Sequence, residues 1–146
     1  MPGSAKRSIT KRIIDANINR VKEGLRVCEE ITRFILNNRL LTRELKEARH
    51  QIDAAARSLA ARSELLQERL SSSDVGENIY ANELKRDSLR DIFFANIQRV
   101  KESVRVLEEF SKLININSSL KFKKVRYKIY AIEKKASAKI SALCAH

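Results

Sequence analysis

Apolar residues recur every three or four positions along most of this chain, which is the spacing of one face of an α-helix. The pattern predicts four long helices, at about 8–37, 41–69, 88–115 and 119–142. The first helix should end at Asn37-Asn38, and the candidate N-caps of the others are Thr42, Asp87 or Ser88, and Ser118 or Ser119. The clearest apolar arc lies on the first helix and consists of Ile14, Ile18, Val21, Leu25, Cys28, Ile31 and Ile35.

The first and third predicted helices have closely similar sequences. Residues 16–30 read ANINRVKEGLRVCEE and residues 95–109 read ANIQRVKESVRVLEE, with eleven identities in fifteen positions. A fainter match relates residues 45–52 to residues 122–129. We therefore predict one all-α domain over residues 1–146, an internally duplicated antiparallel helical bundle of two helix-hairpin repeats. The repeats cover about 8–70 and about 87–142, and the loop between them, about 71–86, is long enough to suggest a function.

Polar side chains interrupt the apolar faces in both repeats. Asn17 and Gly24 fall inside the first arc, and Arg20 lies towards its edge. The third helix repeats this set with Asn96, Arg99 and Ser103, while Arg49 and Arg126 share faces with apolar residues of the second and fourth helices. The pattern predicts that both halves point a polar set inward.

Buried guanidinium groups need anionic partners, because removing each from water costs several kcal/mol. One interpretation is an internal network in which the arginines pair with Glu23, Glu29, Glu102 or Glu108. The other is a phosphate site, because the planar donor fork of arginine matches phosphate oxygens and two related copies could flank one polyphosphate. The two interpretations are compatible within one cavity.

A formal net charge of +12 favours anionic partners, namely nucleic acid, an anionic membrane surface or phosphorylated small molecules. Most of the charge is interleaved with glutamate along the helices, and the densest basic block is residues 121–128. A basic helical RNA-binding or adaptor protein therefore stays as an alternative, although we expect no nucleic-acid partner. The sequence has no apolar run long enough for a membrane span, and its two cysteines fit a reducing compartment, so we expect a cytoplasmic protein without membrane contact.

The common nucleotide-binding and hydrolase motifs are absent: the sequence has no GxxxxGK[ST], GxGxxG or HExxH. Asp74-Val75-Gly76 could bind an anion through backbone N–H groups or supply a carboxylate to Mg²⁺, although such residues are first of all turn formers. His50 has no partner at a zinc-type spacing, so we interpret it as a core or supporting residue. The pairs Glu29-Glu30 and Glu108-Glu109 fit helix-surface salt bridges to Arg26 and Arg105 better than catalytic carboxylates.

The repeats resemble a known family, the small alternative hydroxymethylpyrimidine phosphate kinases of thiamin biosynthesis, which occur alone or fused ahead of thiamine phosphate synthase. The resemblance runs from about residue 12 to about residue 134 as an ordered set of motifs. The matching stretches are 15–20, 23–27, 45–50 with Arg49-His50 at its end, 74–76, 95–99, 102–109 and 125–130.

The resemblance implies an enzyme, a phosphotransferase that uses ATP with Mg²⁺ to convert 4-amino-5-hydroxymethyl-2-methylpyrimidine phosphate to its diphosphate. On that basis we assign Arg20, Arg49, Arg99 and Arg126 to phosphate binding in catalysis and Asp74 to Mg²⁺. Further substrate or ATP contacts are expected from Asn17, Asn96, Glu23, Glu102, His50, Tyr127 and Gly76. The resemblance also leaves open a homodimer, a noncovalent association of this standalone form with thiamine phosphate synthase, or a non-catalytic role as regulatory partner of that synthase.

Overall fold

The structure is a computed structural model that describes residues 3–77, 86 and 88–144. Its elements in chain order are α1 (Gly3–Glu30), a π-helical turn (Ile31–Ile35), α2 (Arg39–Arg57), α3 (Arg62–Gln67), a 3₁₀ turn (Ser71–Ser73), α5 (Leu89–Ser111) and α6 (Ile116–Cys144). The described residues include no β-strand, which confirms the predicted all-α fold class. None of their helices has both the length and the apolar character that crossing a membrane requires.

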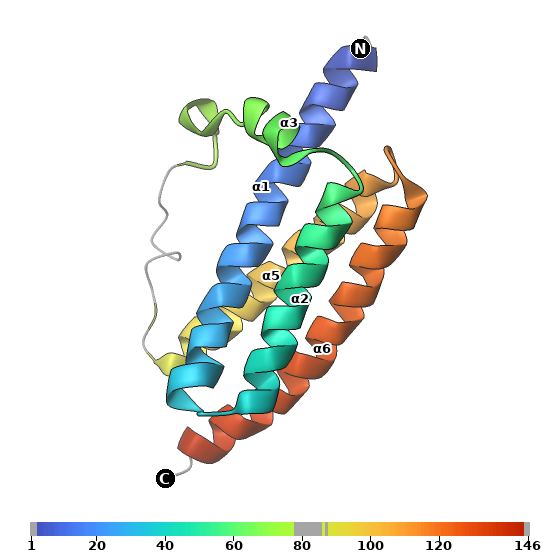
Figure 1. Ribbon diagram of the computed structural model, residues 1–146. Helices are drawn as coiled ribbons and strands as arrows, with labels where there is room; N and C mark the ends of the chain where they lie inside the picture. Colours follow the sequence, from blue (N-terminus) through green and yellow to red (C-terminus); the bar gives the residue numbers. More distant parts are fainter. Residues whose placement is uncertain (1–2, 78–85, 87, 145–146) are drawn as a thin grey trace.

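The four long helices form an antiparallel bundle of two hairpins, α1–α2 and α5–α6 (Figure 1). Helix α1 packs against α5 and α2, and α6 packs against α5 and α2, so each of the four long helices contacts two of the other three. The short helix α3 crosses the end of the bundle near the beginning of α1, and the α1–α2 turn lies at the opposite end (Figure 1). All four long helices contribute to one buried apolar cluster.

The apolar arc predicted on the first helix faces this cluster, with the exception of its last member. Ile14, Val21 and Leu25 are fully buried, whereas Ile35 is 47% exposed. The reason is the π-helical turn, in which Leu36 N–H donates to the Ile31 carbonyl five residues earlier, at 3.0 Å. The wider turn rotates the following residues out of the register that a regular helix would keep.

One predicted N-cap is confirmed and two are wrong. Ser88 accepts the Asp91 N–H at 3.2 Å and caps α5. Helix α2 is capped by Asn38, whose side chain accepts the Leu41 N–H at 2.9 Å, so Thr42 lies inside the helix. Helix α6 begins at Ile116, so Ser118 and Ser119 lie inside it and are buried. In both cases an asparagine, which is a strong cap former, precedes the helix: Asn38 before α2, and before α6 Asn115, whose side chain accepts the Asn117 N–H at 2.9 Å. Asp87 lies outside the described residues.

The second predicted helix is interrupted. Helix α2 ends at Arg57, a turn follows, and α3 begins at Arg62, so the expected single helix over about 41–69 is wrong. The break allows Leu65 of α3 to be buried against α1, at 6% exposure. Only residues 71–77 and 86 of the predicted connecting loop are described.

Gly24 marks the closest approach of α1 and α5. A Cβ atom at this position would lie 2.6 Å from Cγ2 of Val100 and 3.1 Å from the carbonyl oxygen of Asn96. Glycine is therefore required here for packing, and the contact fixes how α1 and α5 sit against each other.

Candidate functional site

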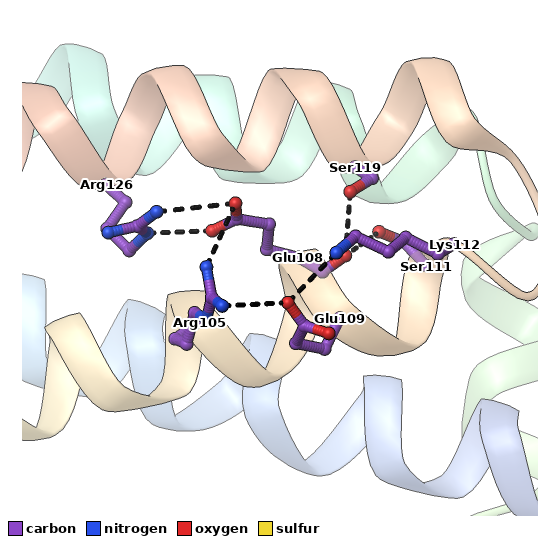
Figure 2. Close-up of polar contacts among 7 residues, drawn as sticks. All are labelled: Arg105, Glu108, Glu109, Ser111, Lys112, Ser119 and Arg126. Atoms are coloured by element: carbon purple, nitrogen blue, oxygen red, sulfur yellow. Dashed lines mark hydrogen bonds and ion pairs between the residues drawn. The ribbon is translucent and has the colours of Figure 1, made fainter.

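A buried carboxylate organises the polar contacts of the second hairpin (Figure 2). Glu108 of α5 is 4% exposed, and Arg126 of α6 donates to it from Nε at 2.7 Å and from Nη2 at 3.4 Å. Arg105 donates to the same carboxylate at 3.4 Å. The hydroxyls of Ser111 and Ser119 both donate to the Glu108 backbone carbonyl, which ties α5 to α6. The hydrogen bond that Arg126 donates to Glu108 raises the pKa of Arg126, so this guanidinium stays charged.

The first hairpin has a corresponding set of contacts around Glu29, which is 5% exposed. Arg49 of α2 donates to Glu29 from Nε at 3.4 Å, and Arg26 lies 3.8 Å from the same carboxylate. Thr32 donates to the Glu29 carbonyl at 3.0 Å and shares a 2.9 Å hydrogen bond with Thr42. Positions equivalent in the sequence repeats therefore make equivalent contacts, while the duplication itself stays a prediction from the sequence.

These contacts correspond to the internal-network interpretation for two of the four predicted phosphate ligands. The side chains of Arg49 and Arg126 are 14% and 13% exposed, and each directs its Nε at a buried glutamate. A phosphate would have to compete for each arginine with a carboxylate that is itself almost completely buried. Their role as phosphate ligands stays a prediction, and their observed partners are Glu29 and Glu108.

Arg20 and Arg99 do not point inward, contrary to the sequence prediction; both are exposed. Arg20 donates to Oδ1 of Asn17 at 3.4 Å, and among the described residues neither arginine forms an ion pair. Each arginine directly precedes a valine that is fully buried in the core, Val21 after Arg20 and Val100 after Arg99. Neighbouring positions on an α-helix lie about 100° apart, so a core that buries the valine leaves the arginine outside it.

The asparagines beside these arginines are held by their own helices. Asn17 donates its amide N–H to the Ile13 carbonyl, and Asn96 donates to the Ile92 carbonyl, both at 2.8 Å. Each amide therefore keeps its oxygen available as an acceptor. In the first hairpin that oxygen already accepts from Arg20.

A cleft of about 580 Å³ lies between α1 and the chain segment that follows α3. It brings together four of the predicted site residues, Asn17, Arg20, Glu23 and Asp74. Other charged residues that line it are Arg12, Asp15, Glu68 and Arg69. The cleft is thus lined by arginines, which can bind phosphate, and also by carboxylates, which can bind a cation or an amino group.

An ion pair that the sequence analysis did not assign holds this cleft together. Arg69 donates to both oxygens of Asp15, from Nε at 2.8 Å and from Nη2 at 2.9 Å. Asp15 is 7% exposed, while 42% of the Arg69 side chain remains accessible. The hydrogen bond to Asp15 raises the pKa of Arg69. Asp15 belongs to the matching stretch 15–20, but no spacing rule connects it to Arg69, because the two residues are 54 positions apart.

The predicted metal residue Asp74 lies at the rim of the cleft and is exposed. Its Oδ1 accepts the Gly76 N–H at 2.8 Å, which is the turn geometry that the sequence also suggested. No group of three or more His, Cys, Asp or Glu residues that could hold a metal occurs in the part of the chain that the structure describes.

The remaining predicted residues lie elsewhere. His50 and Tyr127 are exposed on α2 and α6, where Tyr127 stacks beneath Arg126 at 5.1 Å. Glu102 accepts a 2.9 Å hydrogen bond from Gln98 on the surface of α5. Neither these residues nor Asn96 and Arg99 line the cleft between α1 and the segment after α3.

Comparisons with known proteins give consistent results. A sequence model of the ThiD2 family matches residues 12–135. The chain is 41% identical over 129 residues to a thiamine-phosphate synthase of Synechocystis, covering 84% of this chain and 34% of that protein. It is 38% identical over 126 residues to the thiamine-phosphate synthase of Nostoc punctiforme, covering 86% of this chain and 34% of that protein.

A thiamine-phosphate synthase of Rhodopirellula baltica is 37% identical over 133 residues, covering 90% of this chain and 35% of that protein. The chain therefore spans about a third of the length of these curated relatives. No solved structure matches it.

Proposed function

This chain belongs to the ThiD2 family, and we propose that it acts in thiamin biosynthesis as an ATP-dependent kinase that converts hydroxymethylpyrimidine phosphate to the diphosphate. The supporting observation is the cleft between α1 and the segment after α3. Asn17, Arg20, Glu23 and Asp74, which the family resemblance assigned to the site, come together there with Arg69. The names of the relatives support the pathway, since each is a thiamine-phosphate synthase.

The proposed reaction makes modest demands on side chains. An ionised acceptor phosphate can attack the γ-phosphate of ATP directly, so neither a side-chain nucleophile nor a strong general base is required. Catalysis then depends on holding two polyanions in line and on neutralising the charge that they carry. Arg20 is suited to this, because it is exposed in the cleft and forms no ion pair with any described residue.

Asn17 and Glu23 can supply the directional contacts for the substrate. The Asn17 amide is anchored to its own helix at 2.8 Å, so its oxygen is held in a fixed direction next to Arg20. Glu23 is exposed on the same wall of the cleft and can accept from an exocyclic amino group. A pyrimidine phosphate would then have its phosphate on Arg20 and its ring edge on Asn17 or Glu23.

Mg²⁺ would enter with the nucleotide. Mg²⁺ in kinases is held largely by substrate phosphates, with one or two carboxylates and several water molecules. Three carboxylates of the cleft do not hold Arg69, namely Glu23, Glu68 and Asp74. Glu23 is assigned to the substrate above, and of the other two Asp74 stays our first candidate. In this proposal the protein needs no preformed metal cage.

The test is to incubate the purified chain with ATP, Mg²⁺ and hydroxymethylpyrimidine phosphate and to measure the diphosphate product. Unphosphorylated hydroxymethylpyrimidine serves as the comparison substrate. We expect diphosphate from the phosphate alone, because an anion must be present for Arg20 to position it. Lack of product from a folded protein would refute the kinase proposal.

Binding measurements separate the alternatives if turnover is absent. A regulatory partner of the synthase should bind the pyrimidine phosphate without converting it. A basic RNA-binding or adaptor protein should instead bind arbitrary nucleic acid with a steep dependence on salt.

A further inference from the structure

A second basic region lies at the turn of the first hairpin, at the end of α1 away from α3 (Figure 1). Its residues line a cavity of about 400 Å³, and none of them is acidic. Among the described residues, the four cations of this cavity make no ion pair. We call this set the turn cluster: Arg33, Arg39, Arg43 and Lys46.

The nearest carboxylates on α2 are directed elsewhere. Glu44 pairs with Lys135 of α6 at 3.1 Å, and Glu47 pairs with Lys128 of α6 at 3.3 Å. These contacts turn both carboxylates towards the α2–α6 seam. The turn cluster is therefore left without a counter-charge from its own helix.

The position of the cluster is unfavourable for the isolated fold. The beginning of a helix carries partial positive charge, which favours acidic residues, yet α2 has none in its first turn and begins with Arg39. Arg43 follows four residues later, where two like charges on one helix face repel each other. Such an arrangement becomes favourable when an anion sits among the cations.

The second hairpin shows that such a turn can form without the charges of Arg39 and Arg43, whereas Lys46 has a basic counterpart in Lys123. When the match of residues 45–52 with 122–129 is extended backwards, Arg39 corresponds to Ile116 and Arg43 to Leu120. Ile116 and Leu120 are 68% and 52% exposed, so both sites face solvent whichever residue they carry. Packing of the turn therefore does not require arginine at positions 39 and 43.

We propose that the turn cluster binds a compact polyphosphate anion, such as a free di- or triphosphate or the phosphate chain of a nucleotide. The four cations line one open cavity at the surface, which admits a small ligand with closely spaced charges. Arginine forks match phosphate oxygens, so Arg39 and Arg43 should supply the main contacts. The site is independent of the proposed kinase function, because it shares no residue with the cleft around Arg20.

The test uses inorganic triphosphate without Mg²⁺, titrated into the full chain by calorimetry at about 0.15 M salt. The variant Arg39→Gln/Arg43→Gln is compared with Lys121→Gln/Lys124→Gln, which removes two lysines that line a different cavity. We expect the arginine variant to bind at least about tenfold more weakly, because it loses charge-assisted hydrogen bonds. The lysine variant should stay within about twofold of the wild type, since it keeps every residue of the cluster. Equal weakening in both variants would show a general effect of net charge and would overturn the proposal.

Arg20→Ala separates this site from the cleft. Triphosphate binding that disappears in Arg20→Ala but persists in Arg39→Gln/Arg43→Gln would place the only phosphate site in the cleft; the turn-cluster proposal would fail and the kinase proposal would stand. Binding lost in the arginine pair variant while that variant keeps its kinase activity would support the turn cluster alone.

Two further readouts bear on the same variant. Without ligand, Arg39→Gln/Arg43→Gln should have a higher melting temperature than the wild type, because like-charge repulsion is relieved. A lower melting temperature would mean that the arginines stabilise the fold, against the proposal. Tighter binding of a single-stranded oligonucleotide than of triphosphate, lost in the same variant, would also overturn it in favour of a nucleic-acid surface.

Discussion

The two hairpins of the bundle are alike inside and different outside. In each, a glutamate near the end of the first helix is almost fully buried and is met by an arginine of the second helix, Glu29 by Arg49 and Glu108 by Arg126. In each hairpin a hydroxyl one turn later, of Thr32 or Ser111, donates to the backbone carbonyl of that glutamate. A buried carboxylate has few acceptable partners, so its environment tolerates little variation.

The outer surfaces follow no such constraint. The first hairpin carries the cleft around Arg20 and the basic turn cluster, whereas the α5–α6 turn exposes Leu113 and Ile116 at 72% and 68%. The cleft also depends on Arg69, which has no counterpart assigned in the second hairpin. The difference indicates that repeated contacts hold the fold, while the unrepeated ones are where function should be sought.

Breaking the better-formed buried ion pair should have the largest effect on stability. Arg126→Ala leaves Glu108 buried with only the half-exposed Arg105 beside it, and we expect the free energy of unfolding to fall by about 3 kcal/mol. Arg49→Ala should cost less, because its Nε lies 3.4 Å from the Glu29 carboxylate and the Arg126 Nε lies 2.7 Å from Glu108. Urea denaturation followed by circular dichroism measures both.

The exposed pair between Lys128 and Glu47 provides the control for that experiment. Lys128→Ala should change stability by less than about 1 kcal/mol, as is usual for surface ion pairs. If Arg126→Ala lowered the free energy of unfolding no more than Lys128→Ala, the buried ion pairs would not be what stabilises the two hairpins.

Substitution to alanine at the α1–α5 crossing should destabilise the protein more at Gly24 than at its counterpart Ser103. Gly24→Ala would bring a Cβ atom to 2.6 Å from Val100 Cγ2, so the helices must shift, and we expect a loss of about 2 kcal/mol. Ser103→Ala keeps a similar volume and should cost less than about 1.5 kcal/mol. Thermal denaturation of the two variants gives the answer; similar losses would mean that the crossing is symmetric in its tolerance.

Arg20 and Arg99 occupy equivalent positions in the two hairpins, but we expect their replacement to have different effects on activity. Arg20→Ala should lower kcat/KM for the pyrimidine phosphate at least about tenfold, because one charge-assisted phosphate contact contributes more than 1.4 kcal/mol. Arg99→Ala should have a smaller effect, since Arg99 does not line the cleft. Both variants should keep the helical content of the wild type. Equal losses would instead place both arginines around one ligand, as the sequence alone suggested.

The smallest expected effect concerns the two thiols. Burial, and secondarily the charge of Glu133, raise the pKa of Cys28 from 9.0 to about 12, while Cys144 is exposed. A thiol reagent at neutral pH should therefore modify Cys144 and leave Cys28 intact until the protein unfolds. Mass spectrometry of the labelled protein checks this, and rapid labelling of Cys28 would show that the first hairpin opens locally.

The same pKa shift gives a pH dependence with a definite sign. The unfolded chain releases the Cys28 proton above about pH 9, whereas the folded chain keeps it up to about pH 12. This group therefore contributes a progressive loss of stability as the pH rises through that window. A Cys28→Ala variant should show a weaker decline over the same range.

Much of the fold could be predicted from local patterns, and the exceptions have local causes. Ser88 was identified as a cap because serine at a helix start accepts a backbone N–H within its own turn. Ile35 was placed on the wrong face because a π-helical turn is not visible in the apolar spacing. The break between α2 and α3 was missed for a similar reason: residues 58–61 include no glycine or proline to mark it.

The site was predicted less completely. Asn17, Arg20, Glu23 and Asp74 were chosen as site residues, and the structure brings them to one cleft. Arg49 and Arg126 were chosen for the same role, but each has a buried glutamate as its observed partner. Periodicity assigns a side chain to a face of its helix, and it does not say whether that face meets a carboxylate or an open cleft.

The sequence by itself determined the long helices and most of their amphipathic faces, because these depend on residues within one or two turns of each other. The similarity of residues 16–30 and 95–109 also predicted the correspondence between the hairpins. Tertiary structure alone decided that Arg20 lies outside the core, that Arg69 reaches Asp15, and that the cations of the α1–α2 turn form no ion pair with any residue that the structure describes. These features join residues of different elements or depend on which carboxylates other helices attract.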